Sequence, residues 1–124
     1  MPFVVDDALL LAVLAGTPLA DLDEAINEGD VFTTCSWYYR LGRAAHDESF
    51  AGALSKAIAE LPAERRARAF DGLDSLPDEI GLPDMRELVP VMRRLDAGRQ
   101  LNFLTAEAVA LVLVLEAGIR VTTH

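Results

Sequence analysis

The spacing of apolar residues changes along the chain between a strand pattern and a helix pattern, and this change predicts alternating strands and helices. Runs of β-branched and aromatic residues at 3–5 and 31–35 predict buried strands. A short strand within 79–82 and a closing strand at 119–123 are also expected. Apolar residues three or four apart predict helices near 8–15, 18–28, 37–45, 50–61, 63–73, 85–95 and 105–117. This alternation predicts an α/β fold in which helices cover a mainly parallel sheet.

Helix start and stop signals agree with these ranges. Gly16 and Gly29 follow the first two helical patterns and are expected to end them. The residues expected to cap the helix N-termini are Asp7, Thr17, Ser36, Ser49, Asp84 and Thr105. The sequence therefore carries a start or stop signal for nearly every predicted helix.

Polar residues stand where three of the predicted strands end. Asp6 follows the first strand, Thr34 lies near the end of the second, and Thr122 lies near the end of the closing strand. Because ligands of open parallel sheets bind outside the carboxyl ends of the strands, these side chains are candidates for a functional site.

Length and composition limit the classes that fit. The chain has 124 residues, which suits a single domain over 1–124. Cys35 is alone, so no internal disulfide is expected. The longest apolar run, 108–115, is far shorter than the roughly 20 residues of a membrane span. No basic residue precedes the first apolar run, so we expect no secretory signal, no membrane contact and a cytoplasmic location.

The formal net charge of −9 disfavours a general nucleic-acid binder, although it is compatible with a metal-dependent nuclease that collects carboxylates.

Four segments of the chain resemble motifs of the PIN domain, the metal-dependent ribonuclease fold of many bacterial toxins. These segments are 4–10, 31–34, 104–109 and 116–123. Their order and spacing resemble that family along essentially the whole chain, without its usual C-terminal helix and strand.

The resemblance implies a three-layer α/β/α arrangement and a Mg²⁺ or Mn²⁺ site. Asp6 matches the family's first metal-binding acid, and Glu107 matches the acid that opens the late helix. Asp6 and Glu107 are therefore the expected catalytic and metal-binding residues, with oxygen ligands of the kind these ions prefer. Thr34, Arg40 and Thr122 are the expected substrate contacts.

The implied site is incomplete. Arg40 stands where the resemblance expects a second acid, and His124 stands where a last acid often follows. An arginine there could pair with carboxylates in place of a cation. We therefore hypothesise a PIN-like protein of ribonuclease or toxin ancestry whose nuclease activity is weak or lost. RNA, a cognate antitoxin and a second copy of the chain are the partners that the resemblance implies.

Two other functions stay open. The same scaffold could serve as a non-enzymatic protein-interaction module. Alternatively, Asp6, Asp7 and the segment 104–106 also resemble a response-regulator receiver domain, although no strand ending in Asp is found near 50–54 and Lys56 falls too early. Structural roles compete as well: Asp6 as a strand end and helix cap, and Glu107 as a favourable charge in the first turn of its own helix.

Overall fold

The computed structural model describes residues 2–46, 52–96, 102–115 and 118–120. Within them, four parallel strands form one sheet in the order β3-β2-β1-β4. The strands are β1 (Phe3–Val5), β2 (Val31–Phe32), β3 (Ile80–Gly81) and β4 (Gly118–Arg120). The helices are α1 (Asp7–Leu14), α2 (Ala20–Asn27), α3 (Cys35–His46), α4 (Ala53–Ala59), α5 (Ala63–Asp74), α6 (Met85–Asp96) and α7 (Phe103–Leu115). The predicted α/β class and the parallel sheet are confirmed.

Successive residues of the central strands point to opposite faces of the sheet, as strand geometry requires. Val5 and Val31 are fully buried in one apolar cluster, and Val4 is fully buried in another. Phe32 pairs with Val4 in the parallel ladder and packs against the same cluster as Val4. Apolar side chains therefore cover both faces of the sheet.

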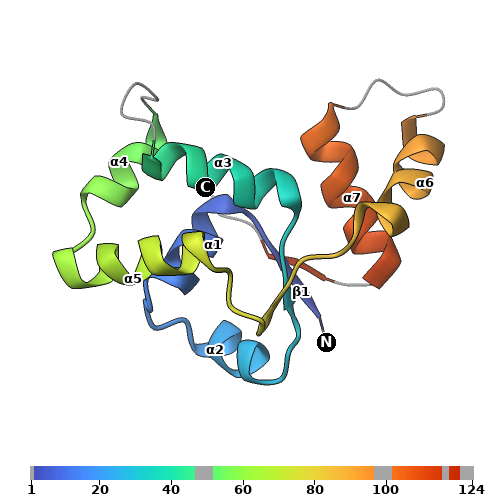
Figure 1. Cartoon of the computed structure of the whole chain (residues 1–124). Coiled ribbons are helices and arrows are strands. Elements are labelled where there is room, and N and C mark those ends of the chain that lie inside the picture. The colour runs from blue at the N-terminus through green and yellow to red at the C-terminus, as the bar shows by residue number, and fades with distance from the viewer. Residues whose placement is uncertain (1, 47–51, 97–101, 116–117, 121–124) are drawn as a thin grey trace.

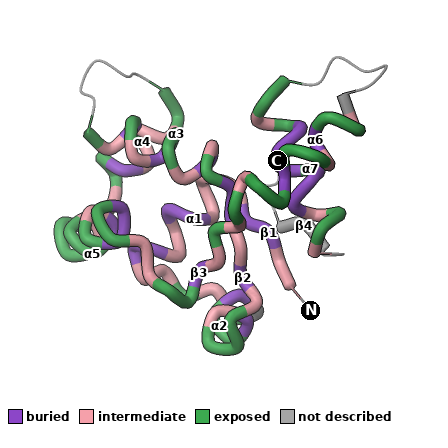
Figure 2. The backbone as a smooth tube through the Cα atoms, turned by 45° about the vertical axis from the view of Figure 1, so that its right-hand side comes forward, coloured by how far each residue is buried: buried purple, intermediate pink, exposed green. Residues whose placement is uncertain are grey.

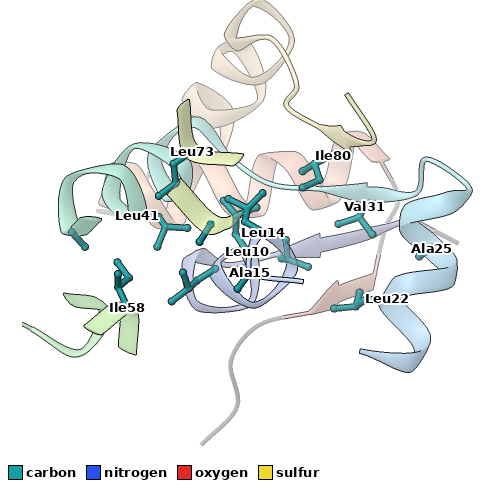
Figure 3. Close-up of a cluster of buried hydrophobic side chains, with 14 residues drawn as sticks. Leu10, Leu14, Ala15, Leu22, Ala25, Val31, Leu41, Ile58, Leu73 and Ile80 are labelled. Atoms are coloured by element: carbon teal, nitrogen blue, oxygen red, sulfur yellow. The ribbon is translucent and has the colours of Figure 1, made fainter. Parts of the chain in front are cut away.

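The larger cluster joins the sheet to α1, α2, α3, α4 and α5. Leu10, Leu14, Leu41 and Leu73 are among its buried members, and Figure 3 shows their side chains converging beside the sheet. Helix α1 contacts both α3 and α5 and forms the centre of this side.

The second cluster belongs to the helical pair α6 and α7, which lies on the other side of β1 in Figure 1. Leu88 and Leu111 are fully buried between these helices and the sheet. In Figure 2 the buried, purple stretches of the tube include parts of β1, α1 and α7, whereas α5 is largely exposed on its outer side. No helix in the described ranges is long and apolar enough to cross a membrane.

Several predicted boundaries are wrong. Strand β2 ends at Phe32 rather than at residue 35, because α3 begins at Cys35. Helix α2 begins at Ala20, not at Pro18, and Thr17 does not cap it. Gly16 and Gly29 do follow the ends of α1 and α2, with the positive φ that favours glycine.

The N-terminus of α7 also differs from the prediction. The helix begins at Phe103, and the Asn102 side chain accepts a hydrogen bond from the Thr105 N–H at 2.8 Å. Asn102 is therefore the cap that the sequence interpretation gave to Thr105. The expected cap Ser49, and residues 121–123 of the expected closing strand, lie outside the described residues.

Candidate functional site

The carboxyl edge of the sheet holds most of the residues that the sequence selected. The strand order reverses beside β1, because β2 and β3 follow it on one side and β4 lies on the other. Such a switch point is where open parallel sheets place their ligands. Asp6 directly follows β1 at this point. Thr122 and His124 follow β4 and lie outside the described residues.

Asp6 is part of the start of α1. Its Oδ1 accepts a hydrogen bond from the Leu9 N–H at 3.0 Å, and its own backbone is extended. These are the features of an N-cap residue. Helix α1 begins at Asp7, so the prediction that Asp7 is the cap was wrong by one residue. The side chain expected to bind metal therefore also has a structural role.

Asp7 occupies the first position of α1 and faces Arg40. Its Oδ2 lies 3.8 Å from Arg40 Nε, and its Oδ1 accepts from the Ala8 N–H at 2.9 Å. Burial raises the pKa of Asp7, the charge of Asp6 raises it further, and the Arg40 guanidinium opposes the rise. Arg40 is thus near an acid, as hypothesised, but that acid is Asp7.

Two threonines join the end of β2 to its surroundings. Thr33 donates its hydroxyl proton to the Val5 carbonyl at 2.9 Å and ties the ends of β1 and β2 together. Thr34 is buried, and its Oγ1 accepts from the Trp37 N–H at 3.1 Å. Thr34 therefore caps α3, a role that the sequence analysis gave to Ser36. Its predicted contact with a substrate stays a prediction.

Glu107 extends from α7 to the N-terminus of α3. Glu107 is 0% exposed, and its two carboxyl oxygens accept hydrogen bonds from two successive backbone N–H groups of α3. Oε2 accepts from Cys35 at 3.1 Å, and Oε1 accepts from Ser36 at 3.2 Å. Since Thr34 takes the next N–H, the first three donors of α3 are all satisfied by side chains.

This geometry changes the structural interpretation of Glu107. Because α7 begins at Phe103, Glu107 lies in its second turn and not in its first. The helix whose positive end it meets is α3, which has no acid in its own first turn. A helix N-terminus is a natural anion site, and here the carboxylate of Glu107 fills it.

The thiol of Cys35 shows the electrostatic consequence of placing the Glu107 carboxylate at the N-terminus of α3. A thiol at a helix N-terminus normally has a lowered pKa, which makes it reactive. Burial instead raises the pKa of the Cys35 thiol, and the nearby charges of Glu107 and Asp84 raise it further. A raised pKa lowers the fraction of reactive thiolate at neutral pH, although Cys35 is exposed.

The donor set does not fit a divalent metal within the described part of the chain. No group of three or more His, Cys, Asp or Glu side chains gathers there in a way that could hold an ion. Mg²⁺ and Mn²⁺ need several oxygen ligands in a regular arrangement. The two candidate ligands, Asp6 and Glu107, both accept hydrogen bonds from helix N-termini.

The participants that sequence reasoning missed are the backbone N–H groups of Cys35 and Ser36. A backbone donor carries no signature in a sequence, and its acceptor lies more than 70 residues away. The contact between Asp7 and Arg40 was also missed, although Arg40 had been selected for its position.

Comparison with protein-family models, with curated protein sequences and with solved structures finds no significant match to this chain.

Proposed function

We propose that this chain is a PIN-like α/β/α protein of ribonuclease or toxin ancestry that has lost its metal chemistry and acts as a non-enzymatic protein-interaction module. The observation that carries this proposal is the use of Glu107. Both of its carboxyl oxygens accept N–H groups of α3, and the residue is fully buried. Turning the side chain toward an ion would leave two helix donors without their acceptor, which costs free energy.

The layering of the molecule supports the scaffold part of the proposal. The apolar clusters around Val5 and Val4 cover opposite faces of the sheet, with α1, α2, α4 and α5 in the first, α6 and α7 in the second, and α3 in both. The receiver alternative fits less well. Receivers share the flavodoxin-type order 2-1-3-4-5, in which the third strand lies beside the first. Here β3 pairs with β2.

An active Mg²⁺- or Mn²⁺-dependent ribonuclease is the second candidate, because Asp6 lies at the switch point of the sheet. Calorimetric titration of the full chain with each ion separates the two. We expect no saturable binding below about 1 mM, the weak end of protein sites for such cations. Binding in that range that is lost in Asp6→Asn, or cleavage of RNA with Mn²⁺, would overturn the proposal.

A second test does not depend on a metal. If Glu107 serves as the resident anion of α3, Glu107→Gln removes a charge that raises the pKa of Cys35. The variant should then react faster with iodoacetamide near pH 8, because more of the thiol is ionised. Glu64→Gln, at an exposed position of α5, is the matched control and should leave the rate unchanged. An unchanged rate in folded Glu107→Gln would contradict the role of Glu107.

A further inference from the structure

A pocket of about 570 Å³ lies at the edge of the sheet where β3 begins, opposite the carboxyl edge that holds Asp6. Its apolar walls are Val13 and Leu14 of α1, Ile26 of α2 and Ile80 of β3. In Figure 1 the chain that leaves α5 passes beside α2 before it enters β3, and this segment also lines the pocket. A volume of this size suits a small molecule.

Three helices line this pocket with residues at or near their C-terminal ends. Helix α1 contributes its last two residues, α2 contributes Ile26 and Asn27, and α5 contributes Asp71, Gly72 and the C-cap residue Ser75. The C-terminus of a helix carries a partial negative charge, which a basic side chain in the last turn commonly offsets. None of these three helices has a basic residue in its last turn. The helix ends therefore make this pocket negative before any side-chain charge is considered.

Arg68 of α5 is the single basic residue among the described residues that line the pocket. Its guanidinium lies against Gly16, which follows the end of α1, and a Cβ atom built at Gly16 would overlap it. Gly16 also has a φ of 76°, a conformation that favours glycine. Arg68 therefore offsets the negative end of α1, and the described lining holds no comparable cation for the ends of α2 and α5.

Two carboxylates, Asp71 and Glu79, add full negative charges to the lining. Neither side chain accepts a hydrogen bond from a described residue or forms an ion pair with one. Both residues are exposed, so they can meet a ligand without breaking an existing contact. The lining thus sets two carboxylates and two uncompensated helix ends against one arginine, which favours a cation.

We propose that this pocket binds a small organic cation, a protonated primary amine whose ammonium group faces Asp71 and Glu79 and whose apolar chain packs against Val13 and Ile26. A divalent metal ion fits less well, because no group of three or more metal-binding side chains gathers in the described ranges. A small anion would meet more negative than positive charge. The site lies at the opposite edge of the sheet from Asp6, so the inference goes beyond the proposed function and does not depend on it.

Titration of the full chain with hexylamine at pH 7, followed by amide correlation spectra in NMR, tests the proposal. Hexylamine is protonated there, as the lysine ammonium is. We expect saturable shifts centred on the amides of Asn27, Gly72, Ser75 and Glu79. The Kd should be on the order of 1 mM, because the ligand is small and its charge partners are exposed. Hexanol and hexanoate have a chain of the same length and should each bind at least about fivefold more weakly.

Asp71→Lys is the decisive variant, because it places a resident cation where the ammonium group of the ligand would lie. Affinity for hexylamine should fall at least about tenfold, since an attraction is replaced by a repulsion. A lysine in the last turn of α5 is favourable to the helix, so the melting temperature should equal or exceed that of the wild type. Glu60→Lys makes the same charge change at the exposed C-cap of α4 and should bind within about twofold of the wild type.

The amide of Nα-acetyl-lysine carries the same ammonium group on a peptide unit. If it binds more tightly than hexylamine, the cation is the lysine side chain of a protein, and if it binds more weakly, the cation is a free amine. Both results support the site.

Equal binding of hexanol, tighter binding of hexanoate, unchanged binding to Asp71→Lys, or shifts centred outside the pocket would each overturn the proposal. Those outcomes leave the metal and RNA-cleavage tests of the proposed function untouched.

Discussion

Helices α1 and α3 both begin at the carboxyl edge of the sheet, but they satisfy their first N–H groups in different ways. Helix α1 is capped by Asp6, which precedes it directly, and has Asp7 in its first turn. Helix α3 has only Thr34 nearby and takes its carboxylate from Glu107, which is distant in the sequence. The comparison shows that an acid at this edge can resemble a metal ligand and still serve a helix.

The difference between the two helices also has an energetic side. Asp6 is partly exposed, so water can replace much of the hydrogen bonding that its side chain provides to α1. Glu107 is fully buried and joins α7 to the N-terminus of α3. The remote cap therefore contributes to tertiary structure, whereas the local cap contributes to one helix.

The largest effect is expected at the remote cap. Glu107→Ala removes the acceptor of two backbone donors and leaves a buried space, so the free energy of unfolding should fall by roughly 2–4 kcal/mol. Glu107→Gln keeps the volume and one good acceptor and should lose about half as much. Urea denaturation followed by circular dichroism measures both. A neutral Glu107→Ala would show that the carboxylate is not needed by α3.

A smaller effect is expected at the local caps. Asp6→Ala should cost about 1 kcal/mol, and Asp6→Asn should be close to neutral because asparagine caps as well as aspartate. Thr34→Ala is the matched deletion at α3 and should cost about 1–2 kcal/mol, since its hydroxyl is buried. The same denaturation series measures them. Equal losses in the alanine and asparagine variants of Asp6 would indicate that its charge, and not capping, is what matters.

The smallest effect is expected at Asp7 and depends on pH. Its pKa is raised in the folded chain, chiefly by burial, so the folded chain keeps this proton to higher pH than the unfolded chain. The free energy of unfolding should therefore fall as the pH rises from about 4, the unfolded range, through the raised pKa. Asp7→Asn should be slightly more stable than wild type at pH 7 and similar at pH 3. Thermal melts across this range test the sign, and a less stable variant at pH 7 would show that the pair with Arg40 outweighs burial.

Much of the fold could be predicted from local patterns. The stops at Gly16 and Gly29 and the buried strand at 3–5 were right, because each depends on a few adjacent residues. The end of β2 was wrong, because Thr33 and Thr34 have β-branched side chains but are used in a link to β1 and in a helix cap. Residue type alone does not separate those uses.

The candidate site could be predicted only in part. Asp6, Thr34 and Glu107 were selected, and Thr34 and Glu107 do meet at the N-terminus of α3. Their shared contact with α3 was not predicted, because backbone donors have no sequence pattern. Asp6 caps α1 where the sequence analysis expected Asp7. A shift of one residue in the helix start decides which carboxyl group reaches the Leu9 N–H.

The sequence by itself determined the parallel α/β class, the positions of most helices and the presence of acids near the carboxyl ends of strands. These depend on hydrophobic periodicity and on local capping, which act over a few residues. Only the tertiary structure decided what the acids do. It placed Glu107 of α7 against the first amides of α3 and Asp7 beside Arg40, because packing across the sheet sets which distant groups meet.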